Sequence, residues 1–364
     1  MSVKSNSIDH VAVIGGGIAG LACAFALVNR GAKVTVFERD RAGKAALWAS
    51  GGMLAGVFES AEADAIDPFV MLARRGLELW RDWAAELGAE AIGYQSCGTL
   101  SPALGKKEGV WLEGLVRSAR QQGFRIESPG PMPPWLKADE SVLFPDDAAL
   151  DNRKLGSRLV DHLRSRGVEI REGVRIDEIS SDVAGEVFIK AEGELHRFYR
   201  AVRATGYDPA EQSSNESASR AVFPVKGQMV SLRAPGLRIE HCVRARDVYI
   251  SQKTDGRVVI GATSEPRRDD LTVRKSAING LRKRAAKLIP ALRQADEIER
   301  WAGIRPATPD GLPIIGYGGM PGLCLATGLY RNGVLFSPAV AELVAASVFH
   351  EGKPPEAFSP WRFT

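Results

Sequence analysis

Apolar and glycine-rich segments alternate near the N-terminus in the order strand, turn, helix, strand. Residues 11–14 (Val-Ala-Val-Ile) are wholly apolar, which is typical of a parallel strand buried on both faces. Residues 21–29 are mostly small and apolar and predict a helix, and Gly31 stands where a helix end tolerates a positive φ. Residues 34–37 (Val-Thr-Val-Phe) predict a second strand. The pattern therefore indicates a βαβ unit with a right-handed connection.

Three further helices and a β-rich stretch are predicted in the middle of the chain. Helices are expected over residues 72–87 and 272–289. A third predicted helix carries leucines at every fourth position and ends at Gly167. Residues 221–264 contain strand-like runs, two of them separated by an Asp-Gly turn. Residues 123–138 are rich in proline and predict a loop.

The last predicted element is a helix that runs to Phe349. Ser337 suits its N-cap, and Pro338 suits the first helical position because proline needs no donor there. The order of elements indicates an α/β fold of two interleaved domains, with this helix returning to the first domain. We expect the first domain to comprise residues 1–90, 143–220 and 300–364, and the second to comprise residues 91–142 and 221–299.

Composition restricts the function classes. A chain of 364 residues suits about two domains, and 45% apolar with 25% charged residues is ordinary for a globular protein. The formal net charge of +4 is small for this length, and the basic cluster around Arg282 has the spacing of a solvated helix face. We therefore expect no nucleic-acid partner.

Cysteine and histidine usage argues against metal and disulfide sites. The four cysteines are widely spaced without a CxxC pair, and no two of the five histidines have metal-ligand spacing. Residues 11–28 form an uncharged run that resembles an export signal or a membrane span, but four glycines interrupt it and Asp9 precedes it. We expect a cytoplasmic protein without a membrane span or a bound metal.

The turn after the first strand carries a dinucleotide-binding pattern. Gly15 permits the tight turn, Gly17 lets a pyrophosphate approach the backbone, and Gly20 lets the helix pack closely on the sheet. Glu38 follows Gly20 by 18 residues (38 − 20) at the end of the second strand, where a carboxylate bonds a ribose hydroxyl and disfavours a 2′-phosphate. The helix N-terminus adds free N–H groups for the phosphates. This unit predicts FAD or NAD without deciding between them.

Three other segments, together with this unit, carry a family resemblance. They are residues 49–54 (Ala-Ser-Gly-Gly-Met-Leu), 301–311 (Trp-Ala-Gly-Ile-Arg-Pro-Ala-Thr-Pro-Asp-Gly) and 328–335 (Gly-Leu-Tyr-Arg-Asn-Gly-Val-Leu). The chain resembles the D-amino-acid oxidase superfamily of FAD-dependent oxidoreductases, and within it the glycine oxidases of the thiamine-biosynthesis type. The resemblance runs nearly end to end.

The resemblance implies FAD, held by a Rossmann-like domain of the glutathione-reductase type that is interleaved with a β-rich α+β substrate and oligomerisation domain. For Gly328 and Gly333, simple turn chemistry is the alternative explanation. The implied cofactor-binding residues are Gly15, Gly17, Ile18, Ala19, Gly20, Glu38, Arg39, Ala46, Leu47, Gly51, Gly52, Met53, Val174, Gly206, Leu329, Tyr330, Asn332, Gly333, Val334 and Leu335.

The resemblance also implies three substrate residues. Arg331 corresponds to the arginine that binds the substrate carboxylate with paired donors; an arginine on a surface loop is the alternative. Tyr249 corresponds to a tyrosine at a strand end whose hydroxyl touches the same carboxylate, unless it is a core aromatic. Arg305 falls in the active-site region, where an ion pair that shapes the site is an equal alternative.

The implied reaction is oxidation of glycine, sarcosine or another small amine by hydride transfer to flavin N5, with O₂ reoxidising the flavin to give peroxide. The imine then hydrolyses to an oxo acid (glyoxylate from glycine) and ammonia, or serves thiamine biosynthesis. The alternatives are a D-amino-acid, sarcosine or proline-type dehydrogenase that uses another electron carrier, and a non-catalytic flavin-binding subunit. Homo-oligomer formation is left open.

Four departures from the family pattern bear on the substrate and on flavin attachment. Gly303 stands where sarcosine-oxidase relatives attach the flavin to cysteine, so non-covalent FAD is expected. After Tyr249 the chain reads Ile-Ser-Gln-Lys, where glycine oxidases carry a proline–arginine pair. Ser264 takes a position that is apolar in some relatives and faces the substrate, and Trp48 is bulky beside the flavin segment.

Overall fold

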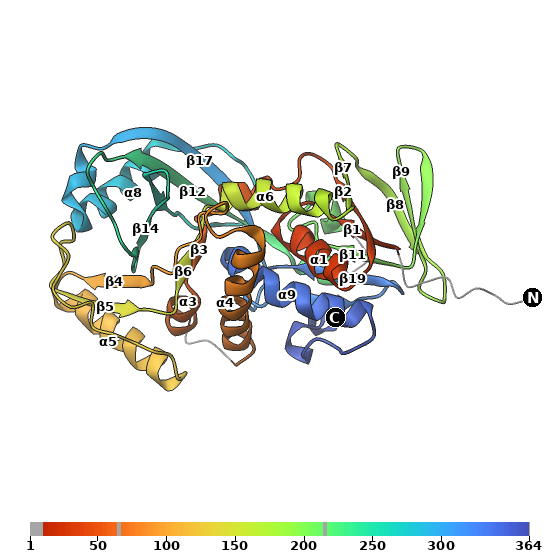
Figure 1. Ribbon diagram of the computed structural model, residues 1–364, viewed down its shortest axis with the longest axis horizontal. Coiled ribbons are helices and arrows are strands. Elements are labelled where there is room, and N and C mark those ends of the chain that lie inside the picture. Colours follow the sequence, from red (N-terminus) through yellow and green to blue (C-terminus); the bar gives the residue numbers. More distant parts are fainter. Residues whose placement is uncertain (1–9, 64–66, 214–216, 364) are drawn as a thin grey trace, which may run out of the picture. The chain divides into compact units, whose positions relative to one another are not determined.

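The computed structural model describes residues 10–63, 67–213 and 217–363 and divides the chain into two compact units (Figure 1). Unit 1 comprises Met1–Trp48, Gly156–Pro224 and Arg305–Thr364, and unit 2 comprises Ala49–Leu155 and Val225–Ile304. Asp9 lies outside the described residues. The compact units divide the chain at Trp48 and Leu155, whereas the expected domain borders lie at residues 90 and 142. The functional assignment of the two domains stays a prediction.

Unit 1 is built on a six-stranded sheet of order β18-β19-β11-β1-β2-β7. All neighbouring strands are parallel except β18 and β19, and the predicted apolar strands occupy its centre, with Val13 in register with Val36 on one side and Val202 on the other. The strands are β1 (His10–Ile14), β2 (Lys33–Glu38), β7 (Glu169–Glu172), β11 (Arg200–Arg203), β18 (Ile314–Tyr317) and β19 (Leu323–Thr327).

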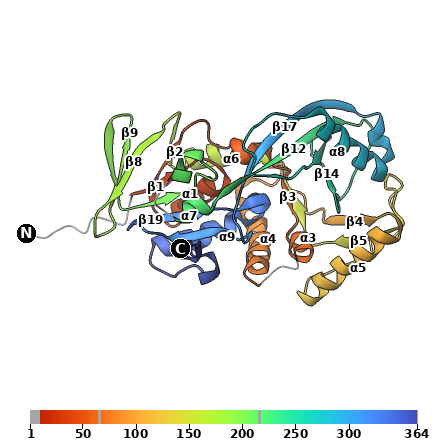
Figure 2. The same ribbon diagram turned by 180° about the vertical axis from the view of Figure 1, so that it is seen from behind.

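The two faces of this sheet are covered differently. Helix α1 (Ile18–Asn29) packs on one face and lies beside α9 (Gly333–Val348), as both ribbon views show (Figures 1 and 2). Ala12 and Ile14 pack on the other face against a three-stranded antiparallel sheet. That sheet consists of β8 (Ile176–Ser181), β9 (Val187–Ala191) and β10 (Glu194–Phe198). The predicted βαβ unit is confirmed.

The uncharged run of residues 11–28 divides between β1 and α1, as the glycines predict. Within the described residues, no helix has both the length and the apolar character that crossing a bilayer requires. The remaining helices of this unit are α2 (Ala45–Ala49), which runs across the border between the units, the C-terminal part of α6 (Asn152–Ser165), and α7 (Ser217–Ala221). Gly167, with φ +79, follows α6 as predicted.

The start predicted for the last helix is wrong. Helix α9 begins at Gly333, with Asn332 as its N-cap, and Pro338 lies inside it. Proline lacks the N–H that would bond to the carbonyl oxygen four residues earlier. The hydroxyl of Ser337 donates to that carbonyl oxygen, on Val334, at 2.9 Å, so the acceptor stays satisfied. Ser337, which was predicted as the N-cap, therefore lies inside the helix and satisfies the carbonyl oxygen that Pro338 leaves without a donor.

Unit 2 contains an eight-stranded sheet, of order β16-β12-β15-β14-β13-β4-β5 with β17 paired to β12. The strands predicted over residues 221–264 are present. The strands are β4 (Thr99–Ala103), β5 (Glu140–Phe144), β12 (Phe223–Arg233), β13 (Cys242–Ala245), β14 (Val248–Gln252), β15 (Arg257–Gly261), β16 (Glu265–Pro266) and β17 (Asp296–Ala307). A short ladder joins β3 (Met53–Leu54) to β6 (Ala148–Ala149).

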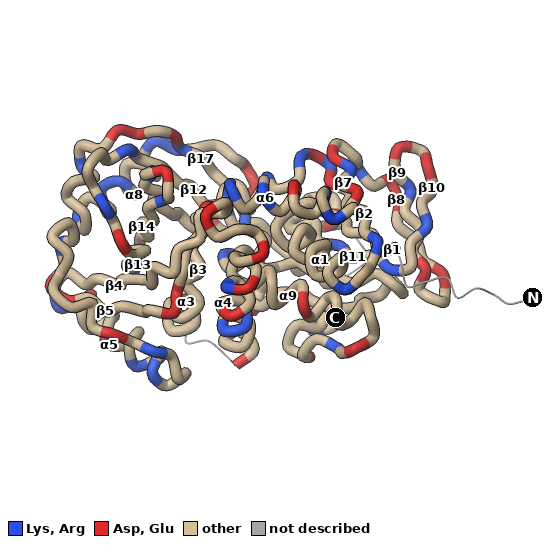
Figure 3. Tube along the Cα trace, viewed as in Figure 1, with Lys and Arg blue, Asp and Glu red and all other residues tan. Residues whose placement is uncertain are grey.

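The helices of unit 2 are α3 (Gly56–Glu62), α4 (Asp67–Leu87), α5 (Gly105–Gln121) and α8 (Lys275–Leu288). Helices α4 and α8 confirm the predictions with shifted starts, whereas α5 was not predicted. Acidic and basic residues are scattered along the trace (Figure 3). On α8, Arg282 pairs with Glu297 and Lys287 pairs with Glu108, each at 3.4 Å, which explains the basic cluster as an ion-paired helix face.

The apolar core of unit 2 lies between α8 and the sheet, so it supplies a stability test. Leu281 is fully buried in it. We expect Leu281→Ala to lower the free energy of unfolding by ~2–5 kcal/mol, because the cavity adds to the lost transfer free energy. Lys283→Ala, an exposed change on the same helix, should alter it by less than ~0.5 kcal/mol. Denaturant unfolding checks both, and equal effects would contradict this packing.

Candidate functional site

The carboxyl ends of four strands of unit 1 meet at one edge of its sheet. β1, β2, β11 and β19 run in the same direction, and they lead into Gly15, Glu38, Gly206 and Gly328 respectively. In open α/β sheets, ligands bind at this edge. The structure thus brings together cofactor residues that the resemblance had taken from four distant parts of the chain.

The three glycines of the first turn lack a side chain for different reasons. A Cβ on Gly20 would overlap the carbonyl oxygen of Gly15, so helix and strand approach as closely as backbones can. Gly15 has φ +109, and a Cβ there would lie 2.5 Å from the carbonyl oxygen of Ala204. A Cβ on Gly17 would meet nothing within 4 Å, and its φ of −76 suits any residue. Only Gly17 therefore leaves open space at the N-cap of α1, where a phosphate would approach.

Glu38 fits the role of a ribose acceptor. Its Oε2 accepts a hydrogen bond from the backbone N–H of Gly16 at 2.7 Å, and its Oε1 accepts one from Asp40 at 2.8 Å. These bonds fix the half-buried carboxylate beside the glycine turn, while an ionised carboxylate has about four acceptor positions. Acceptor capacity therefore remains for two ribose hydroxyls.

A second helix N-terminus lies close to that of α1. After Gly328, with φ +73, the chain forms a short 3₁₀ turn, η3 (Tyr330–Asn332), and enters α9. The Cβ position of Gly333 lies 3.6 Å from Cγ2 of Ile18, in the first turn of α1. Because α9 begins at Gly333 and not at Pro338, its unpaired N–H groups fall within the predicted flavin segment. Two positive helix ends therefore serve one edge of the sheet.

The other predicted cofactor residues of unit 1 lie on several elements that follow the strands of this sheet. Val174 donates its backbone N–H to the carbonyl oxygen of Glu38 at 2.9 Å, and Gly206 accepts from the hydroxyl of Thr327 at 3.0 Å. Arg39 is exposed and pairs with Asp208 at 3.1 Å. The remaining members are Ile18 and Ala19 in α1, Ala46 and Leu47 in α2, Leu329 before η3, Tyr330 and Asn332 in η3, and Val334 and Leu335 in α9.

In unit 2, a buried lysine holds the predicted flavin segment Gly51–Met53. Nζ of Lys253 donates to the carbonyl oxygens of Gly51 at 2.6 Å and Leu150 at 2.7 Å, and it lies 3.4 Å from the hydroxyl of Ser251. Only 4% of Lys253 is exposed, and burial lowers the pKa of its ammonium group. The three acceptors match the three ammonium hydrogens. Sequence reasoning saw the lysine only as a departure from the family pattern and missed this role.

Tyr249 lies on β14 beside the same segment. A Cβ on either Gly51 or Gly261 would collide with its ring or hydroxyl, so these two glycines make room for the tyrosine. Its half-buried hydroxyl donates to Sδ of Met229 at 3.3 Å. The hydroxyl end thus lies against the predicted flavin segment, which favours a site role over a purely core aromatic.

The two predicted substrate arginines belong to unit 1. Arg331 is exposed within η3, one residue before the N-cap of α9. Arg305 is half-buried near the end of β17. Tyr249 belongs to unit 2. The substrate role of each of these three residues therefore stays a separate prediction.

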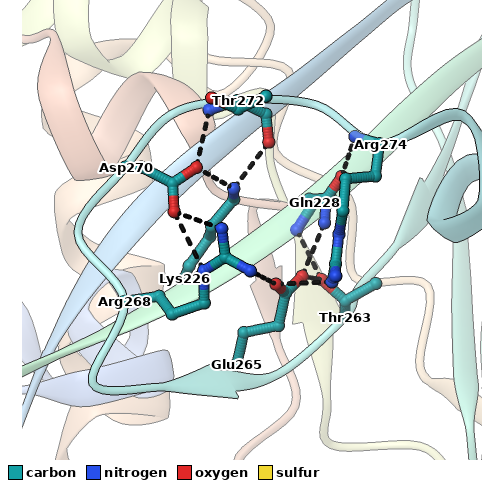
Figure 4. Close-up of polar contacts among 8 residues, drawn as sticks. All are labelled: Lys226, Gln228, Thr263, Glu265, Arg268, Asp270, Thr272 and Arg274. Carbon is teal, nitrogen blue, oxygen red and sulfur yellow. Dashed lines mark hydrogen bonds and ion pairs between the residues drawn. The ribbon is translucent and has the colours of Figure 1, made fainter.

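The segment that carries Ser264 is fixed to β12 by a polar network (Figure 4). The fully buried Lys226 donates to Asp270 and to the carbonyl oxygen of Thr272, both at 2.5 Å. Gln228 donates to Glu265 at 2.5 Å and accepts the backbone N–H of Arg274 at 2.6 Å. Arg268 and Arg274 pair with Glu265, and Arg268 also pairs with Asp270. The ammonium group of Lys226 and the guanidinium group of Arg268 hold the pKa of Asp270 below its usual range.

Comparison with known proteins decides the family. The model of the FAD dependent oxidoreductase family (DAO) matches residues 10–347. The chain belongs to this family. The resemblance seen in the sequence is confirmed, as are FAD as the cofactor and the expected fold class. No cluster of three or more potential metal-ligating side chains occurs among the described residues.

Similar proteins match this chain over nearly its whole length. It is 31% identical to glycine oxidase from Geobacillus kaustophilus over 92% of the chain and 91% of the relative. The crystal structure of glycine oxidase from that organism superimposes with a TM-score of 0.87, covering 98% of this chain and 99% of the other. The bifunctional protein ThiO/ThiG of Synechocystis is 35% identical over 98% of the chain. The chain spans about half the length of these bifunctional relatives, 54% in that case.

The open space at Gly17 gives a test of the phosphate site. We expect Gly17→Ala to leave the stability of the FAD-free protein unchanged, since the new methyl group meets no protein atom. FAD affinity should fall by roughly tenfold or more (~1.4 kcal/mol), because the methyl group fills the phosphate approach. Fluorescence titration with FAD measures this. Gly114→Ala, another glycine with open space around it, is the control, and equal FAD affinity in both variants would refute the assignment.

The buried lysine gives a second test. Lys253→Met keeps the length of the side chain but leaves the carbonyl oxygens of Gly51 and Leu150 without their charged donor, at a cost of ~1–3 kcal/mol for each. We expect weaker FAD binding and a changed visible flavin spectrum, with partial rescue by Lys253→Arg. Lys154→Met, which removes only a surface bond to Thr254, should leave the spectrum unaltered. A Lys253→Met protein with normal FAD affinity would contradict the anchoring role.

Proposed function

We propose that this protein oxidises glycine or another small amine, such as sarcosine or a small D-amino acid, with FAD. The observation that carries the proposal is the position of Arg331: an exposed guanidinium group one residue before the N-cap of α9, at the carboxyl edge of the sheet. A planar carboxylate accepts two hydrogen bonds from such a group. The relatives named glycine oxidase, matched over more than nine-tenths of the chain, support the choice of substrate class.

In this proposal the side chains bind and orient the substrate. Arg331 holds the carboxylate, and Arg305 contributes positive charge or an ion pair. For Tyr249, which belongs to unit 2, a hydroxyl contact with a substrate carboxylate is proposed separately. FAD, when bound, would supply the two-electron oxidation as the acceptor of a hydride from the substrate carbon. An amine that is bound neutral and held at the right distance needs no further base, so the contribution of the protein is orientation.

The proposed products are the imine and peroxide, with O₂ as the electron acceptor. Hydrolysis of the imine gives an oxo acid and ammonia, which are glyoxylate and ammonia when glycine is the substrate. Similarity to the bifunctional ThiO/ThiG proteins supports a role in thiamine biosynthesis, where the imine itself would be consumed.

We also propose that FAD is bound without a covalent link. Gly303 lies on β17, and a Cβ at this position would overlap the Cβ of Ala49. A cysteine side chain has no space there unless the backbone moves. The packing therefore supports the expectation drawn from the sequence, and denaturation with acid should release all of the flavin into the supernatant.

A substrate panel tests the proposed reaction. We expect peroxide release with glycine or sarcosine to exceed release with larger D-amino acids, measured with the FAD-loaded protein under air. Substrate consumption without peroxide, together with reduction of an artificial electron acceptor, would replace the oxidase by a dehydrogenase. Absence of turnover with either acceptor would identify a flavin-binding protein without catalysis.

Arg331→Ala tests the carboxylate assignment. Loss of a charge-assisted hydrogen bond worth ~1.5–3 kcal/mol predicts that kcat/KM for glycine falls by about tenfold or more, with FAD content unchanged. Arg293→Ala, an exposed arginine of unit 2, serves as the control and should keep full activity. Unchanged kcat/KM in Arg331→Ala would exclude this residue as the carboxylate ligand.

A further inference from the structure

Two cysteines that are 145 residues apart in the sequence meet in unit 2. The Sγ atoms of Cys97 and Cys242 lie 3.9 Å apart. Strands β4 and β13 run parallel here, with Cys242 in register with Thr99, and the backbone N–H of Cys242 donates to the carbonyl oxygen of Gly98 at 3.1 Å. The main chain therefore holds the two thiols together, and both are free.

The separation lies within reach of a disulfide bond. An S–S bond measures ~2.05 Å, so the sulfur atoms need to approach by about 2 Å, which side-chain rotation supplies. The ring of His241 also contacts the carbonyl oxygen of Cys97 at 2.5 Å, which ties the segment before β4 to β13 a second time. These backbone contacts keep the thiols of Cys97 and Cys242 adjacent while one of them reacts with an oxidant.

One thiol of the pair is suited to attack an oxidant. Cys97 is half-buried, and a hydrogen bond from the thiol of Cys242 lowers its pKa to about 7 against the opposing effect of burial, with the charge of Lys253 adding to the effect. The lowered pKa increases the fraction of Cys97 that is present as thiolate, the nucleophilic form. The other two cysteines differ, since burial raises the pKa of Cys23 far above its usual range and that of Cys324 to about 12.

We propose that Cys97 and Cys242 form an oxidative modification site, closed to a disulfide by hydrogen peroxide. The thiolate of Cys97 attacks one peroxide oxygen, the O–O bond breaks, and the leaving hydroxide takes a proton from solvent to become water. The thiol sulfur of Cys242 then attacks the sulfenic sulfur, the S–O bond breaks, and the leaving hydroxide takes the Cys242 proton as water. In total, two thiols and one peroxide give one disulfide and two waters.

The site connects to the flavin segment through a short chain of contacts. The hydroxyl of Ser251 lies 3.6 Å from Sγ of Cys242 and 3.4 Å from Nζ of Lys253, and Lys253 holds the carbonyl oxygen of Gly51. Drawing Cys242 toward Cys97 removes one neighbour of Ser251 and disturbs this chain. The disulfide should therefore weaken FAD binding. Peroxide as the physiological oxidant rests on the proposed function, since the oxidase reaction would release it.

The experiment treats the FAD-loaded protein with reagent peroxide in the absence of any amine substrate, so the result does not depend on turnover. Free thiols are then blocked with N-ethylmaleimide and peptides are analysed by mass spectrometry. We expect a Cys97–Cys242 cross-link that is two hydrogens lighter than the two reduced peptides together and is reversed by dithiothreitol. Cys23 and Cys324 should not be oxidised. FAD dissociation should be at least about threefold faster in the oxidised protein, and Cys242→Ser should leave Cys97 as a sulfenic acid with the FAD rate unchanged.

The pH profile separates this site from accidental oxidation. Because the thiolate reacts, the alkylation rate of Cys97 by iodoacetamide should rise with pH and reach half of its maximum near pH 7. Oxidation of Cys97 without the cross-link, or modification of all four cysteines at the same rate, would overturn the site. A disulfide that leaves the FAD dissociation rate unchanged would overturn its link to Lys253.

Discussion

The close approach of α1 to β1 is the constraint on which the cofactor-binding unit depends. Only a hydrogen atom fits between position 20 and the carbonyl oxygen of Gly15, so the helix starts directly above the end of the strand. This contact brings the free N–H groups of α1 to the carboxyl edge of the sheet, and Glu38 is tied to the same turn through Gly16. α9 packs beside α1 and adds a second helix N-terminus. A dinucleotide site follows from backbone geometry before any particular side chain is considered.

In unit 2, a buried charge holds the predicted flavin segment. A buried ammonium group is costly unless hydrogen bonds satisfy it, and Lys253 finds backbone oxygens on two separate segments together with the hydroxyl of Ser251. The lysine therefore joins Gly51 to Leu150 without a carboxylate partner bonded to its Nζ. Tyr249 occupies the space left by the missing side chains of Gly51 and Gly261. The ammonium group of Lys253 and the space left by Gly51 and Gly261 together fix the position of the segment Gly51–Met53.

The parts of the fold that could be predicted from the sequence are those with a strong local signal. The βαβ unit follows from its apolar runs and glycine spacing, and α4, α6 and α8 follow from their repeating apolar positions. The predicted start of helix α9 is five residues late because Ser337 and Pro338 imitate an N-cap and a first helical position, whereas the helix continues through the proline. α5 was not predicted, although Leu112, Leu115 and Ala119 recur at helical spacing and are buried. Contacts between distant segments, such as Lys253 with Gly51 or Cys97 with Cys242, leave no local pattern, so only the structure shows them.

Family membership and FAD are shown, whereas the substrate depends on how the side chains of this chain bind a small amine. The central claim is that an amine carrying a carboxylate passes two electrons directly to bound FAD. Mixing the FAD-loaded protein with glycine under anaerobic conditions tests this without involving oxygen or any other acceptor. The account predicts that the visible absorbance of oxidised flavin disappears in step with imine formation. Flavin that remains oxidised with glycine, sarcosine and small D-amino acids alike would contradict it.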